Sequence, residues 1–234
     1  MSYLLRIDAS ASGAASYSRQ VADSFTQAWT GDIVRRDIGR HPIRHLDAFG
    51  ITARTTPTGE HSPEQMQAAA LQDELVTEFL GAQAYLFAVP MYNYTMPSVF
   101  KAWLDHIMIV GKTIGLGTTT PTAGRPAVIV SARGGGYGPG APQHGKDFLI
   151  PPLTAILSDP NLMALDVRVI TPELTYAPVV EPLRHLLPQH HISLKNAHIE
   201  AHLQARDILG TIAVTPSSPS AAIRSKTRVR VIGS

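Results

Sequence analysis

Serine hydroxyl groups gather in the segment ASASGAASYS at residues 9–18, which contains Ser10, Ser12, Ser16 and Ser18. Hydroxyl groups donate hydrogen bonds, and the small residues between them let backbone N–H groups approach a ligand. A predicted helix follows, and the partial positive charge at a helix N-terminus attracts anions. Because the segment has no lysine, it suits one phosphate better than a triphosphate. A serine-rich connection in which Ser18 caps the helix is an equal alternative.

A second unusual segment, PMYNYTM at residues 90–96, places two tyrosines and an asparagine between prolines. A connection from a strand to a helix needs only a few turn residues. Tyr92 and Tyr94 can supply aromatic surface, and Asn93 can both donate and accept hydrogen bonds at the edge of a ring. The segment therefore suits a flat, partly polar ligand, although a simple lead-in to the next helix is the alternative.

A third segment, ARGGGYGPG at residues 132–140, combines glycines with one cation, Arg133. Glycine permits positive φ and presents bare N–H groups, and the guanidinium adds a fixed positive charge. Read alone, this segment is better explained as a flexible surface turn.

Apolar runs and helical patterns alternate along the chain and predict the elements that carry these segments. Short apolar runs predict strands at 3–8, 33–37, 84–89, 127–131 and 166–170. Helical patterns lie between and after them, at 18–30, 62–81, 99–108, 146–157, 182–187 and 193–209. Ser62, Pro63 and Gln65 form a capping-box start. This alternation predicts an α/β fold with one doubly wound parallel sheet and helices on both faces.

Ligands of doubly wound sheets bind beyond the carboxyl ends of the strands, where the winding reverses. Each of the three unusual segments directly follows a predicted strand, so we expect them to meet at that edge. A ligand with a phosphate at one end and a flat heterocycle at the other uses all three, and FMN is the common metabolite of that shape.

Four stretches, SASGAASYSRQVADSF, PMYNYTMPSVFKAWLDHI, VGKTI and SARGGGYG, resemble the FMN-dependent NADH-azoreductases and NADH:quinone oxidoreductases of flavodoxin-like fold. The resemblance runs from the first strand to about Gly138 and continues weakly to about Leu209. It implies a flavodoxin-like, doubly wound, five-stranded parallel sheet of order 2-1-3-4-5. We expect residues 1–210 to form this FMN-binding domain and residues 211–234 to be a basic, flexible tail.

The resemblance also implies which residues contact FMN. Phosphate contacts fall on Ser10, Ser16, Tyr17 and Ser18; one ring loop is Met91, Tyr92, Asn93 and Tyr94, and the other is Ala132, Arg133, Gly134 and Gly135. Ala132 stands where the family often has a hydroxyl residue. No protein residue is catalytic, because the flavin carries the chemistry. We expect Arg133 with the Gly134 and Gly135 amides at the N1–C2=O edge of the flavin, and Asn93 at the opposite edge.

The activity implied by the resemblance is a ping-pong transfer of two electrons from NADH or NADPH to quinones or azo compounds. Reduced nicotinamide and acceptor use the same place in turn, in a homodimer with the flavins at the interface. Segment 112–126 is expected to border the substrate pocket. The alternative function is a flavodoxin-like FMN electron carrier that reacts poorly with NADH; such carriers are usually smaller and strongly acidic.

Two further motifs favour other functions only weakly. Residues 140–146 match most of a P-loop, but Asp147 replaces the Ser or Thr that would hold Mg²⁺. Ten histidines include the pair His198 and His202 in HIEAH, whose Glu is not in the zinc-protease position. A solvated helix face explains that pair better, and no metal site is predicted.

Composition excludes several classes of protein. The chain has 234 residues and no cysteine, so disulfides, thiolate metal sites and cysteine nucleophiles are excluded. No membrane span or targeting segment is recognised, and we expect a cytoplasmic protein without a membrane partner. Four basic residues lie in the last 25; without them 16 basic and 18 acidic residues remain, a net charge of −2. The body therefore has no basic field for nucleic acid.

Overall fold

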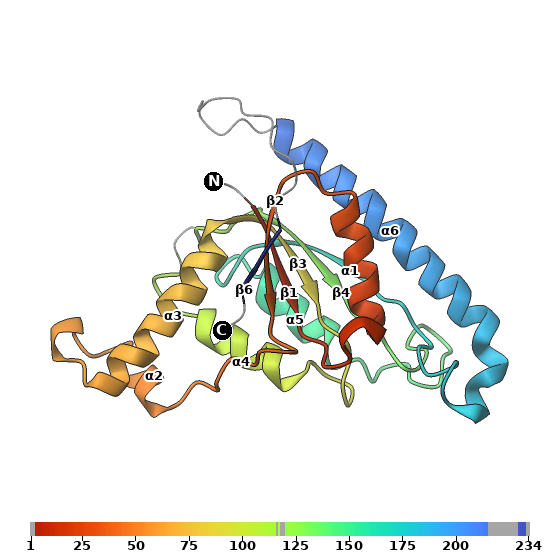
Figure 1. Ribbon diagram of the computed structural model, residues 1–234, viewed down its shortest axis with the longest axis horizontal. Helices are drawn as coiled ribbons and strands as arrows, with labels where there is room; N and C mark the ends of the chain where they lie inside the picture. The colour runs from red at the N-terminus through yellow and green to blue at the C-terminus, as the bar shows by residue number, and fades with distance from the viewer. Residues whose placement is uncertain (1–2, 116, 118–119, 215–228, 233–234) are drawn as a thin grey trace.

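Six parallel strands form one sheet in the order β5-β4-β3-β1-β2-β6 (Figure 1). This computed structural model describes residues 3–115, 117, 120–214 and 229–232. The strands are β1 (Tyr3–Asp8), β2 (Asp32–Asp37), β3 (Ala82–Ala88), β4 (Pro126–Val130), β5 (Asp166–Ile170) and β6 (Val229–Ile232). The first five keep the order 2-1-3-4-5, so the predicted doubly wound sheet is confirmed.

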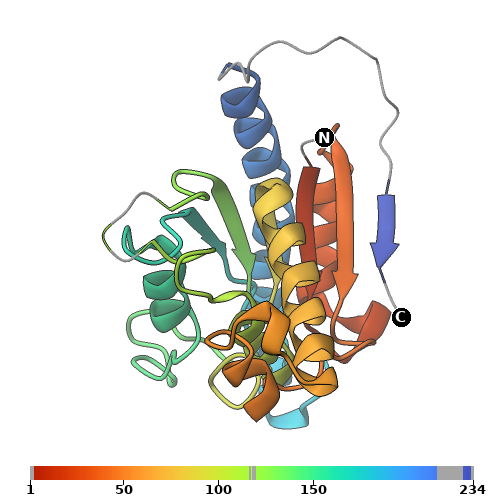
Figure 2. The same cartoon turned by 90° about the vertical axis from the view of Figure 1, so that its left-hand side faces the viewer.

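Helices cover both faces of the sheet (Figures 1 and 2). One face carries α1 (Tyr17–Gln27) and α6 (Leu187–Val214), and the other carries α3 (Pro63–Gly81), α4 (Ser98–Ile107) and α5 (Ile150–Ser158). The shorter helices are α2 (Ala48–Thr52), η1 (Gly13–Ala15), η2 (Thr58–Glu60) and η3 (Glu181–Leu186). No helix within the described residues is long and apolar enough to cross a membrane.

Side-chain alternation divides the core into two layers. In β1, Leu5 and Ile7 pack on the face of α3 and α4, whereas Leu4 packs on the face of α1 and α6. Strands β3 and β4 are apolar at nearly every position because both of their faces are covered.

Aromatic side chains fix α4 against β3. The Phe87 ring lies 5.8 Å from Phe100 and 5.6 Å from Trp103, centroid to centroid. Burying each such ring stabilises the fold by about 1.5–3 kcal/mol. Because the loop at 90–97 joins β3 to α4, it is held at both ends by fixed elements.

Local signals at the start of α3 are as predicted. The Ser62 hydroxyl accepts from the Gln65 N–H at 3.2 Å, and the Gln65 side chain accepts from the Ser62 N–H at 2.9 Å. Pro63 occupies the first turn, where its missing N–H costs nothing. The capping box is therefore confirmed.

The C-terminal region departs from the sequence expectation. Helix α6 continues to Val214, and Val229–Ile232 form β6, which pairs in parallel with β2. Only part of the tail can be compared, because residues 215–228 and 233–234 lie outside the described residues. For Val229–Ile232 the expectation of a flexible tail is wrong. The physical reason is that an edge strand offers unpaired N–H and C=O groups, which a second strand satisfies.

Candidate functional site

Three loops follow β1, β3 and β4 at the carboxyl edge of the sheet. Backbone hydrogen bonds extend the strand pairing into them: the Ala9 N–H donates to the Ala88 carbonyl at 3.0 Å, and the Met91 N–H donates to the Ala132 carbonyl at 2.9 Å. The loops therefore begin side by side, and the predicted meeting of the three unusual segments is confirmed.

The Tyr92 hydroxyl joins the first two loops. It accepts from the Ala11 N–H at 3.1 Å and lies 3.2 Å from the Ser10 hydroxyl. Ser10 is buried, and its oxygen also accepts from the Ser12 N–H at 3.2 Å. Tyr92 thus holds the serine loop against the tyrosine loop.

Helix α1 begins in the serine loop at Tyr17. Ser16 is the N-cap, and its hydroxyl accepts from the Arg19 N–H at 3.4 Å. The alternative in which Ser18 caps the helix is therefore wrong; Ser18 is buried, with its hydroxyl 3.0 Å from that of Ser16. Within the described part of the chain, the Tyr17 and Ser18 N–H groups have no hydrogen-bond partner. A helix N-terminus with such donors and two hydroxyls can hold an anion.

A tight turn explains the unusual composition of the tyrosine loop. Tyr92 and Thr95 exchange two backbone hydrogen bonds, of 2.9 and 3.0 Å. Between them Asn93 and Tyr94 have φ values of 48° and 70°. Asparagine tolerates this left-handed conformation, whereas for tyrosine it costs about 1–3 kcal/mol. The turn brings both side chains to the cavity described next.

A cavity of about 760 Å³ opens where the tyrosine loop meets the glycine loop. Its lining comprises Met91, Asn93, Tyr94, Gly134, Gly135, Gly136, Tyr137, Ala141, Pro142, Gln143, Glu173, Leu174, Tyr176, Leu183, His185 and Leu186. Five predicted ring contacts are in this lining, and Tyr92, Ala132 and Arg133 are not. Its mixture of flat rings, aliphatic groups and glycine backbone suits a flat heterocycle.

Close packing, rather than positive φ, explains the glycine at 134. A Cβ atom there would lie 2.4 Å from two ring carbons of Tyr176. The Tyr176 N–H donates to the Gly134 carbonyl at 3.2 Å, and the Leu174 N–H donates to the Gly135 carbonyl at 3.2 Å. The N–H groups of Gly134 and Gly135 form no hydrogen bond with any described residue. Two backbone donors thus remain free at the cavity wall.

Arg133 is buried and its charge is matched by two carboxylates. Its guanidinium donates to Asp147 at 2.7 Å and to Glu173 at 3.4 Å, and it lies 5.3 Å from the centre of the Tyr137 ring. The expectation of a fixed cation at the ligand is therefore not supported by the geometry. Arg133 instead joins the glycine loop to the segments after it, and Gly134 and Gly135 present only backbone dipoles to the cavity.

Several lining residues were missed by sequence reasoning, above all Glu173, Tyr176 and His185. They follow β5, whose carboxyl end lies at the same edge of the sheet as those of β1, β3 and β4. Applying the carboxyl-edge rule to the fifth strand would have found them. The segment TPELTY at residues 171–176 carries no motif of its own, so no local pattern predicts a site there.

Segment 112–126 is expected to border the substrate pocket, but none of its described residues lines this cavity of the single chain. Thr120 and Thr122 donate instead to the Met163 carbonyl, at 3.2 and 2.7 Å. The segment leads into the amino end of β4, and in a parallel sheet that end lies opposite the site.

The two rival motifs also have local explanations. Asp147, at the Mg²⁺ position of the P-loop match, accepts from the Ile150 N–H at 2.9 Å in the first turn of α5. The ring Nδ1 of His198 lies 2.7 Å from the Ser24 hydroxyl, between α6 and α1. His198 is thus half-buried, not on a fully solvated face, and burial lowers its pKa, with His202 adding to the effect. No group of three or more potential metal ligands occurs among the described residues.

Comparisons with known proteins show the family to which the chain belongs. Residues 2–173 match the family model described as flavodoxin-like fold. A relative named FMN-dependent NADH:quinone oxidoreductase from Frankia casuarinae is 38% identical over 211 residues, covering 88% of this chain and 99% of its own. A relative of the same name from Streptomyces coelicolor is 38% identical, covering 89% of this chain and 96% of its own.

Solved structures support the fold. An azoreductase from Bacillus anthracis superposes with a TM-score of 0.72 at 18% identity, covering 88% of this chain and all of its own. An FMN-dependent NADH-azoreductase from the same species, solved in complex with FMN, gives 0.71 at 20% identity, covering 89% of this chain and 99% of its own. The chain therefore belongs to the flavodoxin-like family of FMN-dependent NADH:quinone oxidoreductases.

Proposed function

We propose that this protein is an FMN-dependent oxidoreductase that transfers two electrons from NADH to quinones. One observation carries the proposal. Free N–H groups at the start of α1 and a cavity with free backbone donors lie at one sheet edge, and the Tyr92 hydroxyl joins the serine loop to the tyrosine loop.

At the phosphate end, Ser10, Ser16, Tyr17 and Ser18 are the proposed contacts. The free N–H groups of Tyr17 and Ser18 lie in the first turn of α1, where the helix dipole also favours an anion. The Ser16 and Ser18 hydroxyls are 3.0 Å apart, so both can turn toward the same phosphate.

At the ring end, Met91, Asn93 and Tyr94 are the proposed contacts on one side, and Gly134 and Gly135 on the other. The side-chain amide of Asn93 can donate or accept at the ring edge. We assign the N1–C2=O edge to the two glycine N–H groups, which can stabilise negative charge there. Ala132 and Arg133 lie at the end of β4 and hold these glycines in place. Tyr92 supports the serine loop.

When bound, FMN supplies the two-electron chemistry that links NADH oxidation to reduction of the acceptor. The protein binds and orients it, and no side chain is assigned as a catalytic acid, base or nucleophile. The exposed rings of Tyr94 and Tyr176 offer flat apolar surface to either substrate. The proposal includes a ping-pong order, in which NADH or NADPH and then a quinone or azo compound use the cavity in turn. It also includes a location in the cytoplasm.

A homodimer with the flavins at its interface is also part of the proposal. Large apolar side chains are exposed around the cavity: Tyr94, Phe148, Tyr176 and Val179. The Phe148 N–H donates to the Tyr94 carbonyl, so these two side chains leave adjacent backbone. A second copy would cover this apolar surface, which a monomer leaves in water.

Reconstitution with FMN followed by an assay of NADH oxidation tests the function. We expect bound flavin and steady NADH consumption that depends on a quinone acceptor. A yellow protein that is inert to NADH would favour the electron carrier, and a protein that cannot bind FMN would overturn the proposal. Sedimentation should give twice the 25.2 kDa chain mass; an active monomer would exclude the dimer alone.

A further inference from the structure

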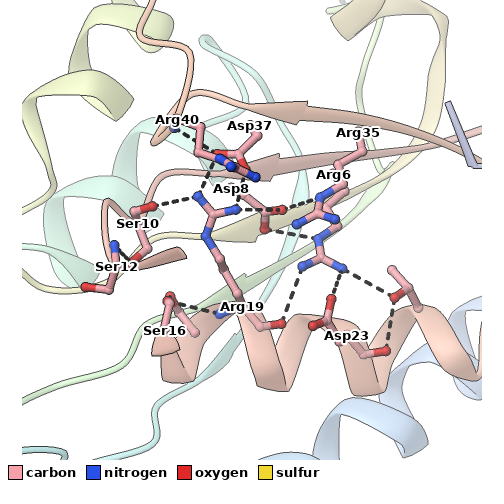
Figure 3. Close-up of polar contacts among 12 residues, drawn as sticks. Arg6, Asp8, Ser10, Ser12, Ser16, Arg19, Asp23, Arg35, Asp37 and Arg40 are labelled. Carbon is pink, nitrogen blue, oxygen red and sulfur yellow. Dashed lines mark hydrogen bonds and ion pairs between the residues drawn. The ribbon is translucent and has the colours of Figure 1, made fainter. Parts of the chain in front are cut away.

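A largely buried ionic cluster lies beside the serine loop (Figure 3). Three guanidinium groups, from Arg6, Arg19 and Arg35, are paired with three carboxylates, from Asp8, Asp23 and Asp37. The charges balance, as buried ions require. None of these residues is among the ligand contacts proposed above, so the role of the cluster is open.

Arg19 alone in this cluster reaches the serine loop with its side chain. Its guanidinium donates two hydrogen bonds to the Asp37 carboxylate, of 2.5 and 2.6 Å, and a third to the Ser10 carbonyl at 2.6 Å. Its backbone N–H donates to the Ser16 hydroxyl at 3.4 Å. One residue thus connects the end of β2, the loop after β1 and the N-cap of α1.

Both members of the Arg19–Asp37 pair are charged in the folded protein. Burial opposes ionisation of Asp37, but hydrogen bonds from Arg19 and from the Arg40 N–H outweigh it and lower the pKa of the carboxyl. Burial likewise opposes the charge of Arg19, but Asp37 and Asp8 outweigh it and raise the pKa of the guanidinium. The planar fork of arginine fits a carboxylate in two places at once, which lysine cannot do.

The backbone after β2 packs directly against the serine loop. A Cβ atom at Gly39 would lie 2.1 Å from the Ser10 carbonyl oxygen and 2.8 Å from Arg19 Nη2. The Gly39 N–H also donates to the Asp8 carbonyl at 3.0 Å. Glycine is needed here because the two chain segments touch, and the contact fixes the carbonyl that Arg19 holds.

We propose that Arg19 is a positioning residue for the phosphate end of the site, an inference that rests on the proposed FMN function. It does not touch the ligand, because both of its terminal nitrogens are engaged and its side chain is buried, 6% exposed. Arg19 holds Ser10 and Ser16 in place before the ligand binds. The free-energy cost of ordering the serine loop is therefore not incurred when the phosphate binds. The effect is therefore confined to ligands that carry the phosphate.

The test compares the binding of FMN with that of riboflavin, which lacks the phosphate. The variant Arg19→Lys keeps the charge but loses the fork. We expect FMN affinity to fall about tenfold or more, because hydrogen bonds to charged groups are involved. Riboflavin affinity should change less than about twofold, because the ring end is untouched.

Arg35→Gln is the matched control. Arg35 pairs with Asp8 at 2.5 Å in the same cluster, but no hydrogen bond or ion pair joins its side chain to the described residues of the serine loop. The Arg35→Gln variant should keep the wild-type ratio of FMN affinity to riboflavin affinity, even if its free energy of unfolding is lower. If Arg19→Lys does not fold, Asp37→Asn, which removes the charged partner with little change of shape, gives the same comparison.

Each outcome decides the matter. If Arg19→Lys keeps the wild-type affinity for both ligands, or loses affinity for both by the same factor, the positioning role is overturned and the proposed function is left intact. If Arg35→Gln also loses FMN affinity but keeps riboflavin affinity, the positioning role of Arg19 is overturned, because the effect then belongs to the whole cluster. A wild-type protein that binds neither ligand overturns both proposals.

Discussion

The two ends of the site are built on different principles. At the phosphate end, a short loop rests on a charge cluster in which the Asp8 side chain is fully buried (Figure 3). At the ring end, a cavity of about 760 Å³ is bordered by tyrosines that remain exposed, 43% for Tyr94 and 57% for Tyr176.

This difference matches the proposed tasks. A phosphate anchor binds one chemical group, so fixing its donors in advance gains affinity without loss of function. A ring site that receives a nicotinamide and then a quinone needs broad apolar surface more than fixed hydrogen bonds. We therefore expect a negative charge placed among the phosphate donors to remove the cofactor, and packing changes at the ring end to have graded effects.

The largest effect is expected from Ser16→Asp. A carboxylate at the N-cap still accepts from the helix N–H groups, but it would repel the phosphate at short range in a partly buried site. The variant should fold and purify without flavin, as measured by circular dichroism and absorbance on the same sample.

Ser16→Asn is the control for this change, because asparagine also caps helices but has no charge. It should retain most of the flavin. A folded and fully yellow Ser16→Asp protein would contradict the phosphate assignment.

Gly134→Ala should produce the next largest effect. The new methyl group would overlap the Tyr176 ring, and such overpacking typically costs about 1–3 kcal/mol. Because the change is at the ring end, FMN and riboflavin affinity should fall by similar factors, of about fivefold to a hundredfold. Isothermal titration with both ligands measures this.

Gly138→Ala is the matched control in the same loop, since apart from its chain neighbours no described residue has an atom within 4 Å of a Cβ there. It should bind both ligands as the wild type does. If Gly134→Ala weakened the binding of FMN but not that of riboflavin, the division of the site into a phosphate end and a ring end would be wrong.

A smaller effect is expected from removing the Asn93 side chain. A neutral hydrogen bond contributes about 0.5–1.5 kcal/mol, so FMN affinity should weaken about threefold to tenfold. Because Asn93 has positive φ, Asn93→Gly is the cleaner variant, and Asn93→Ala adds backbone strain.

Comparing the two variants separates the causes. If the side chain is a ligand contact, both should lose affinity, and only the alanine variant should also lose stability to urea. Wild-type affinity in Asn93→Gly would remove Asn93 from the ligand contacts.

The smallest expected effect concerns the acid stability of the phosphate end. The pKa of Asp37 is below its ordinary 3.8 in the folded protein. When the pH falls below this ordinary value, the Asp37 carboxyl binds a proton in the unfolded chain before it does so in the folded protein. The charged carboxyl therefore stabilises the fold above the ordinary pKa, and this stabilisation is lost as the pH falls through the lower pKa of the folded state. The stability gap between wild type and Asp37→Asn should therefore narrow on acidification below that value.

Urea unfolding between neutral pH and pH values below the ordinary Asp37 pKa measures this gap. Asp23→Asn serves as the comparison, because the Asp23 side chain is 52% exposed. A gap for Asp37→Asn that widened with acid would show that the sign is wrong.

Much of the fold could be predicted from the sequence because its signals are local. Continuous apolar runs marked β1, β3 and β4, and Ser62 with Gln65 marked the start of α3. The three loops were recognisable because each follows a strand and has an unusual composition.

What could not be predicted depends on contacts between distant segments. Arg19 and Asp37 are 18 residues apart, and two long-range features bring them together: the parallel pairing of β1 and β2 and the packing of α1 on the sheet. The carboxylates that neutralise Arg133 come from segments 14 and 40 residues later in the chain. For β6 a local signal did exist, because RVRV at residues 228–231 alternates charged and apolar residues as an edge strand does. The basic charge of the tail instead favoured a flexible extension.

The most direct test of the central claim is an anaerobic titration of the FMN-loaded protein followed by absorbance. We expect NADH to bleach the oxidised flavin band in equal proportion to the bound FMN, and a quinone added afterwards to restore it. A flavin band that NADH leaves unchanged, or a reduced protein that quinone cannot reoxidise, would contradict the account.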